Sequence, residues 1–366
     1  MHAILRFSAP VAVAVVMSAG PLAAQPAGDS ALIAEAVQVL PEALRADATV
    51  VAYDPATGAR RVVRQGSNFI ECQPRDPADG FVRCYHKLFG PRRDLEKKLK
   101  AEKKSDDEVS QAVAAAIKAG TIPATPQGVM SYRLYDKRDR IQNLWVMSLP
   151  NATPESVGVS TDSQRSAALE GRGLPWMMLP GTPGAHIMIP INPKPAKSTI
   201  SDVAADPVEQ ATLPLPQDLR AGATVYTYDE HGARKVLRQG TNQIECMPRG
   251  ADDFTWCYNK AGAARRDLSA KLRAEKKTDQ EIQAAMAEAT KAGTITPTSF
   301  GTMSYRMYSK PDRIQLLWVL SVPGATPESI GVSTASQRDE ALELHGLPWL
   351  MLPGTPGAHI MIPINK

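Results

Sequence analysis

The 366-residue sequence has few aromatic residues, almost no excess charge of either sign and only one pronounced apolar run. Aromatic residues make up 5% of the chain, but the hydrophobic content of 43% is normal for a globular protein and excludes wholesale disorder. The 42 basic and 38 acidic residues give a formal net charge of +4 and are interleaved along the chain. This balance argues against nucleic acid as a partner.

The single apolar run lies near the N-terminus and predicts a signal peptide. Arg6 supplies a positive charge, residues 11–17 are apolar, and residues 21–24 end in small side chains. The run is shorter than the roughly 20 residues that a membrane-spanning helix needs, so we expect cleavage near Ala24 rather than an uncleaved anchor. We therefore expect a periplasmic or secreted protein with no transmembrane span after cleavage.

Cysteine is also scarce, and its placement predicts disulfides. Cys72 and Cys84 lie in similar surroundings to Cys246 and Cys257. The spacing within each pair is much wider than the C-x-x-C spacing of a four-cysteine metal site. In an exported chain we expect the bonds Cys72–Cys84 and Cys246–Cys257, and no metal.

What the chain does contain is a long internal repeat. The segment GLPWMMLPGTPGAHIMIPIN (173–192) recurs at 346–365 with one Met-to-Leu change, and VVRQGSNFIEC (62–72) recurs as VLRQGTNQIEC (236–246). A period this long predicts tandem globular domains rather than a solenoid. The expected organisation, with each domain folding separately, is a signal peptide (1–24), a first repeat domain (25–192), a linker (193–200) and a second repeat domain (201–366).

Each copy has the pattern of an α+β domain, with a mainly antiparallel sheet and an inserted helical hairpin. A Gly-containing turn between apolar stretches predicts a β-hairpin over 48–65. A charged helix over 92–104, whose basic face we interpret as solvated, precedes a second helix capped by Ser105 and Glu108. Short strands around each cysteine and three later strands complete the sheet, the later ones over 128–135, 141–149 and 186–191.

The two repeated motifs resemble those of a bacterial family of exported proteins. Its members carry an early LR-x-G-T-N…C segment and a C-terminal PW-x-M…GTP-x-x-H-x-MIP segment, which occur here as LRQGTNQIEC (237–246) and LPWLMLPGTPGAHIMIPI (347–364). The resemblance covers about 60–191 and 234–364, and this chain differs in its two tandem copies and long charged helical pair. The resemblance implies export and the domain limits, and it supplies no catalytic residue.

Only two of the six histidines occupy matching positions, and they are the first candidate site residues. His186 and His359 each follow a Pro-Gly turn at the start of a strand. An imidazole there can act as a general base or ligand-binding group, or it can satisfy a loop carbonyl within a tight turn. Matched serines such as Ser131 and Ser304 lack the G-x-S-x-G pattern of a nucleophile.

Three further matched pairs are weaker candidate site residues: Glu71 and Glu245, Arg75 and Arg249, and Trp176 and Trp349. Each glutamate lies in a strand and must face solvent or find a partner, which the arginine or histidine of its copy would supply. Each tryptophan lies in a Pro-rich segment, where it either packs in the core or forms the apolar lip of a ligand site. One histidine and one glutamate per copy are too few for a metal site, and we expect no cofactor.

These features favour a non-enzymatic protein that binds a small molecule or an envelope ligand. The alternative is a hydrolase that uses His186 and His359, and a third possibility is a purely structural envelope component. The PGTPG turn lacks the Lys-Ser/Thr pair of a phosphate-binding loop, which argues against a nucleotide site. A pocket containing His359, Glu245 and Trp349 would favour a ligand or a reaction, whereas a flat surface would favour the structural role.

Overall fold

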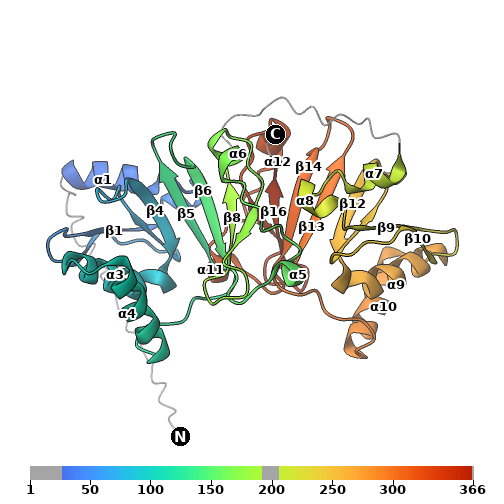
Figure 1. The fold of residues 1–366 in the computed structure, drawn as a ribbon, viewed down its shortest axis with the longest axis horizontal. Helices are drawn as coiled ribbons and strands as arrows, with labels where there is room; N and C mark the ends of the chain where they lie inside the picture. Colours follow the sequence, from blue (N-terminus) through green and yellow to red (C-terminus); the bar gives the residue numbers. More distant parts are fainter. Residues whose placement is uncertain (1–26, 192–205, 365–366) are drawn as a thin grey trace, which may run out of the picture.

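The computed structural model describes residues 27–191 and 206–364, which form two copies of one α+β unit and confirm the expected fold class. The expected signal peptide (1–24) and linker (193–200) lie outside the described residues. Figure 1 shows the two copies side by side, the first in blue to green and the second in yellow to red. Each copy is an eight-stranded sheet with a helical hairpin at the outer flank of the molecule.

The first sheet has the strand order β2-β1-β3-β4-β5-β6-β8-β7. All neighbouring strands are antiparallel except β1 and β3, which run parallel. The strands are β1 (Thr49–Tyr53), β2 (Arg60–Arg64), β3 (Ile70–Gln73), β4 (Phe81–His86), β5 (Met130–Tyr135), β6 (Asn143–Ser148), β7 (Trp176–Met178) and β8 (His186–Pro190).

The second sheet repeats this topology in the order β10-β9-β11-β12-β13-β14-β16-β15, again with one parallel pair, β9 and β11. Its strands are β9 (Thr224–Tyr228), β10 (Arg234–Arg238), β11 (Ile244–Met247), β12 (Phe254–Asn259), β13 (Met303–Tyr308), β14 (Leu316–Ser321), β15 (Trp349–Met351) and β16 (His359–Pro363). The repeated C-terminal segment therefore contributes two paired strands per copy, where the sequence predicted one.

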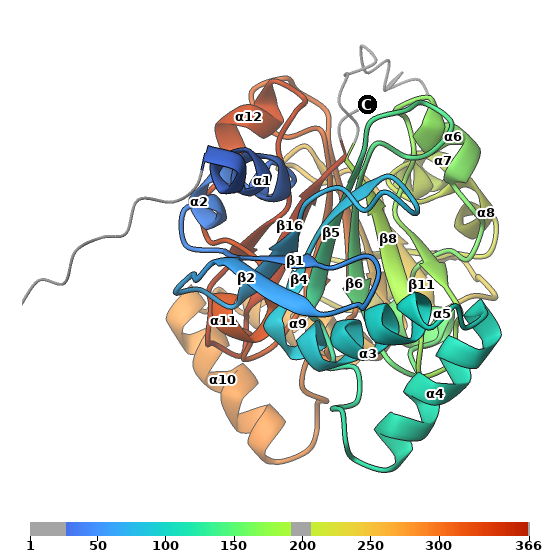
Figure 2. The same ribbon diagram turned by 90° about the vertical axis from the view of Figure 1, so that its left-hand side faces the viewer.

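In the chain, the inserted helical hairpin follows the fourth strand of each sheet and precedes the fifth. It consists of α3 (Gly90–Ala101) and α4 (Asp106–Lys118) in the first copy, and of α9 (Ala263–Ala274) and α10 (Asp279–Lys291) in the second. Figure 2 shows both hairpins, α3 with α4 and α9 with α10. Ser105 and Glu108 form the predicted capping box at the start of α4. Helix α3 ends before the predicted position 104, because Lys103 adopts a left-handed backbone with φ of 61°.

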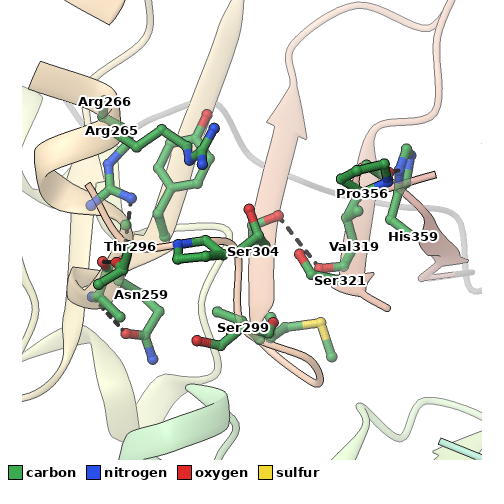
Figure 3. Close-up of a pocket in the computed structure, with 18 of the residues that line it drawn as sticks. Asn259, Arg265, Arg266, Thr296, Ser299, Ser304, Val319, Ser321, Pro356 and His359 are labelled. Atoms are coloured by element: carbon green, nitrogen blue, oxygen red, sulfur yellow. Dashed lines mark hydrogen bonds between the residues drawn. The ribbon is translucent and has the colours of Figure 1, made fainter. Parts of the chain in front are cut away.

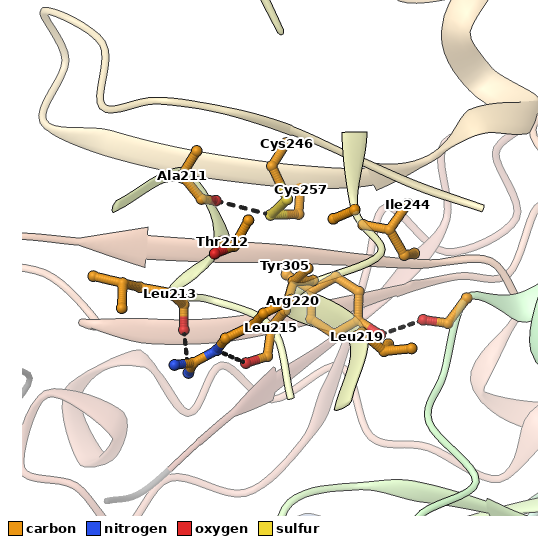
Figure 4. Close-up of a disulfide and its surroundings, with 12 residues drawn as sticks. Ala211, Thr212, Leu213, Leu215, Leu219, Arg220, Ile244, Cys246, Cys257 and Tyr305 are labelled. Atoms are coloured by element: carbon orange, nitrogen blue, oxygen red, sulfur yellow. Dashed lines mark hydrogen bonds between the residues drawn. A yellow bond between two sulfur atoms is a disulfide. The ribbon is translucent and has the colours of Figure 1, made fainter. Parts of the chain in front are cut away.

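Short helices precede each sheet and follow its sixth strand. The preceding pairs are α1 (Ala27–Val37) with α2 (Glu42–Arg45) and α7 (Pro207–Thr212) with α8 (Gln217–Arg220); the later helices are α5 (Pro154–Val157), α6 (Arg165–Leu169), α11 (Pro327–Ile330) and α12 (Arg338–Leu342). Helix α6 lies within SQRSAALEG (163–171), the one segment among these whose sequence predicts a short helix. Arg220 fixes the connection from α7 to α8 by donating to the carbonyls of Leu213 and Leu215, both at 3.0 Å (Figure 4).

Both predicted disulfides are present, and each joins two residues directly opposite one another on antiparallel strands. Cys72 on β3 faces Cys84 on β4, and Cys246 on β11 faces Cys257 on β12. The described residues contain no free cysteine. These bonds fit an oxidising compartment.

The two copies share one hydrophobic core, and tyrosines bridge them reciprocally. Tyr132 on β5 donates its hydroxyl hydrogen bond to the carbonyl of Gly331 in the second copy. Tyr305, at the matching position on β13, donates to the carbonyl of Gly158 in the first copy. Both tyrosines are fully buried in a core cluster that draws residues from both sheets. The copies therefore pack as an isologous, approximately two-fold pair.

A second reciprocal contact joins the copies through residues that differ in type. The ring of His86 lies 2.7 Å from the carbonyl oxygen of Glu328 through Nε2, and Asn259 Nδ2 donates to the carbonyl of Glu155 at 2.9 Å. A carbonyl can only accept, so His86 must carry its proton on Nε2. Asn259 occupies the position of His86 in the second copy, and the shared hydrogen-bonding role explains this replacement.

Candidate pocket around the matched histidines

The nearly identical C-terminal segments fold into turns that hold one imidazole in each copy. In the second copy the Thr355 hydroxyl donates to the carbonyl of Leu352 at 2.8 Å and accepts from the Gly357 N–H at 3.2 Å. Leu352 has a left-handed φ of 51°, which the turn imposes. His359 Nδ1 then lies 2.8 Å from the carbonyl oxygen of Gly357. The repeated residues therefore encode a fixed position for the histidine.

The same turn orients His186 in the first copy, where Nδ1 lies 2.7 Å from the carbonyl oxygen of Gly184. Because a carbonyl can only accept, Nδ1 carries the proton in both rings and the Nε2 lone pair stays available. Neither Nε2 atom has a hydrogen-bond partner among the described residues. Burial lowers the pKa of His186, which the Gly184 carbonyl raises in part and nearby Arg133 lowers further. The neutral His186 ring therefore presents a hydrogen-bond acceptor.

His359 lines a pocket with a cavity volume of about 290 Å³ in the second copy. Figure 3 shows Arg265 and Arg266 on one side of this pocket and His359 with Pro356 on the opposite side. Ser304 and Ser321 lie between them, and the Ser304 hydroxyl makes only a long bond of 3.4 Å to the carbonyl of Val319. The pocket thus combines cationic donors, hydroxyl groups and an imidazole.

His186 lines a corresponding pocket of about 320 Å³ in the first copy. Most lining positions match between the two pockets, because the same elements build both. Besides the histidines, the matched polar pairs are Tyr85 and Tyr258, Arg92 and Arg265, Arg93 and Arg266, Thr125 and Thr298, Ser131 and Ser304, Arg133 and Arg306, and Ser148 and Ser321. The pocket is therefore a feature of the repeated unit.

The central arginine of each pocket projects from the fifth strand of its sheet and is largely buried. Arg306 on β13 has its guanidinium carbon 4.6 Å from the centre of the Trp256 ring, a cation–π contact that fixes its position. Burial lowers the pKa of Arg306. Burial, with Arg93 and Arg83 nearby, lowers the pKa of Arg133 to about 10, so this guanidinium remains charged at neutral pH.

The predicted glutamates lie behind the pockets and have partners other than those expected. Glu245 pairs with Arg234 at 3.0 Å and with Arg266 at 2.6 Å. Glu71 pairs with Arg60, and its Oε2 is buried without a hydrogen-bond partner. Burial raises the pKa of Glu71, and Arg60 offsets only part of this effect.

The predicted arginines and tryptophans lie away from the histidine pockets. Arg75 forms ion pairs with Glu35 at 3.2 Å and Asp136 at 3.4 Å, and Arg249 follows β11 at the far end of that strand. Trp176 and Trp349 are 2% and 3% exposed in the core, although Trp176 also borders a separate cavity of about 450 Å³. Of the predicted site residues, only His186 and His359 lie in the matched pockets.

The pocket arginines are the functional candidates that the sequence analysis missed. Arg92, Arg93, Arg265 and Arg266 belong to the repeated RRDL motif on helices interpreted as solvated. The first turn of each helix instead faces the sheet, where these side chains line the pockets. Exact recurrence of both arginines within the repeat is the sequence signal that could have identified them.

The described residues contain no group of three or more His, Cys, Asp and Glu side chains that would hold a metal ion. None of their helices is long and apolar enough to cross a membrane. No protein-family model, no curated protein and no solved structure matches this chain.

Proposed function

We propose that this chain is an exported, non-enzymatic binding protein, periplasmic or secreted, that takes a small molecule into the pocket beside His359. The resemblance to exported bacterial proteins and the two disulfides support export. The single observation that carries the binding role is the pocket itself, which recurs in both copies with a uniquely oriented imidazole. A hollow lined by a few convergent polar groups is the usual form of a small-molecule site.

The pocket gives less support to the alternative hydrolase. A serine nucleophile needs its hydroxyl hydrogen-bonded to the base, but the Ser304 hydroxyl is directed to the carbonyl of Val319. The imidazole of a catalytic triad is oriented by a carboxylate, whereas a Gly357 carbonyl orients His359. The third possibility, a purely structural envelope component, expects a flat surface over the repeated segment, and this segment borders a hollow.

Histidine nuclear magnetic resonance tests the binding role directly. The ring Cε1–Hε1 signals of His186 and His359, assigned with the variants His186→Gln and His359→Gln, are followed during titration with small probes. The probes are succinate, inorganic phosphate, succinamide, ethylamine and glycerol, which cover anionic, cationic and neutral chemistry. We expect a saturable shift of the His359 signal with at least one probe class. If every probe leaves both signals unchanged, the proposed binding role is wrong.

A further inference from the structure

The two matched pockets differ at the positions that determine charge, and this difference points to a ligand class. We infer that the second-copy pocket binds a small oxyanion, a carboxylate or a phosphate. In the first copy the carboxylate of Glu96 already pairs with the arginines that would bind such an anion. This inference rests on the proposed function, because it names the ligand chemistry of the same site. It also makes the two copies unequal, with one binding site per chain.

Glu96 neutralises the arginines of the first pocket from within. It lies on α3, lines the pocket, and accepts from Arg92 Nε at 2.9 Å and Arg93 Nη1 at 2.8 Å. Its side chain is 19% exposed. Burial alone would raise the pKa of Glu96, but Arg93 and Arg92 outweigh burial and lower it, so the carboxylate is ionised at neutral pH. An incoming anion would have to displace this internal carboxylate.

The second copy has Ser269 at the position of Glu96, so this position supplies no carboxylate to pair with the arginines of the second pocket. Arg265 donates Nη2 to the neutral hydroxyl of Thr290 at 3.1 Å and has no ion-pair partner among the described residues. Arg306 likewise has no ion-pair partner there, and the Nε atoms of Arg265 and Arg306 are buried without acceptors. Arg266 turns instead to Glu245. No aspartate or glutamate lines this pocket.

Two further differences open the second pocket at the start of its helix. Phe89 lines the first pocket, whereas Gly262 occupies the matching position, and a Cβ there would lie 2.8 Å from Arg266 Nη1. Pro91 in the first turn of α3 has no backbone N–H, whereas the matching Ala264 in α9 has one. The first turn of α9 contains no acidic residue. Its backbone N–H groups and partial positive charge add to the attraction for an anion.

Reciprocal exchange of the two differing side chains tests this inference in the full chain. The variants are Ser269→Glu, which copies the first pocket, and Glu96→Ser, which copies the second. Glu96→Gln serves as a control that removes the charge and keeps the size of the side chain. The Cε1–Hε1 signals of His186 and His359 are recorded at a pH of about 8, where an ordinary imidazole is neutral. Succinate and inorganic phosphate are the anionic probes, and succinamide is the neutral analogue of succinate.

In the unmodified protein, succinate or phosphate should shift the His359 signal saturably while the His186 signal stays in place. Ser269→Glu should weaken this response about tenfold or more, and Glu96→Ser and Glu96→Gln should each create a response at His186. Succinate and phosphate are compared to decide which oxyanion fits better. Melting curves establish that each variant is folded.

Three results would overturn the inference. These are an equal response of His186 and His359 in the unmodified protein, an undiminished response in Ser269→Glu, or a response to succinamide as strong as that to succinate. Binding of succinamide, ethylamine or glycerol at His359 without binding of either anion would contradict the oxyanion assignment and leave the proposed function standing. No response to any probe would contradict both.

Discussion

Replacement of His86 by asparagine should remove part of the acid sensitivity of the folded protein. The buried His86 ring bridges the two copies, with Nε2–H donating to the carbonyl of Glu328 at 2.7 Å and Nδ1 accepting from the Leu88 N–H at 3.2 Å. The bond from Leu88 requires the neutral ring, because a protonated imidazole has no acceptor at Nδ1, whereas Nε2–H can donate to the carbonyl of Glu328 in either state. Burial lowers the pKa of His86, which the Glu328 carbonyl raises in part and Lys87 lowers further.

The sign of the effect follows from this lowered pKa. The unfolded chain takes up a proton near the ordinary histidine pKa of about 6.5, while the folded protein still resists protonation. Stability is therefore complete above about pH 6.5 and is lost as the pH falls toward the lower folded pKa. Each pH unit within this window costs about 1.4 kcal/mol per histidine, so His86 accounts for at most about 2 kcal/mol at pH 5.

The residue that matches His86 in the second copy is Asn259, so asparagine is the replacement to test at position 86. Asn259 donates to the carbonyl of Glu155 at 2.9 Å and accepts from the Ala261 N–H at 2.9 Å, the same two roles without a titrating group. His86→Asn should therefore lie within about 1 kcal/mol of the unmodified protein at pH 8, the difference arising from the smaller side chain. At pH 5 its relative stability should rise. His186, whose pKa burial also lowers, leaves a residual acid effect in both proteins.

The assay is urea unfolding of both proteins at pH 8 and pH 5, with the free energy of unfolding compared between the two pH values. The converse variant, Asn259→His, is the matched control and should gain acid sensitivity. If the loss of stability between pH 8 and pH 5 is the same with and without His86, the assignment of a neutral, bridging imidazole is refuted.

Three further predictions concern the shared core and the disulfides. Tyr305→Phe should destabilise the protein by about 1–3 kcal/mol in urea unfolding, because it leaves the carbonyl of Gly158 without its donor; a change below about 0.5 kcal/mol would show that this bond does not hold the copies together. Cys246→Ser with Cys257→Ser should cost about 2–4 kcal/mol by the same assay, and an unchanged unfolding midpoint would contradict this. Residues 201–366 alone should self-associate through the surface that normally meets the first copy, measured by light scattering, rather than form the stable monomer expected from the repeat; a stable monomer would argue against a shared core.

Local sequence patterns predicted most elements of the fold. The Gly-containing turn gave the hairpin of β1 and β2, and Ser105 with Glu108 gave the start of α4, because turns and caps depend on neighbouring residues. The strand β7 was missed because its three residues carry no alternating pattern. The packing of the two copies was missed because contacts such as Tyr132 with Gly331 join residues far apart in the chain.

The candidate site was only partly predictable for the same reason. The repeat singled out His186 and His359, because no other histidines occur at matching positions. It did not indicate that helix α9 would bring Arg265 against β13 and the turn before β16, since this placement depends on tertiary packing. The charged helix also resembled a solvated face, because Asp, Glu and Lys residues are interleaved along it after the two arginines.

The most direct test of the proposed site is a crystal structure of the full chain grown with succinate or phosphate, whichever binds more tightly. One bound anion per chain is expected, held in the second-copy pocket by the guanidinium groups of Arg265 and Arg306 beside the ring of His359. An anion bound in the first-copy pocket beside Glu96, with the second pocket empty, would contradict it.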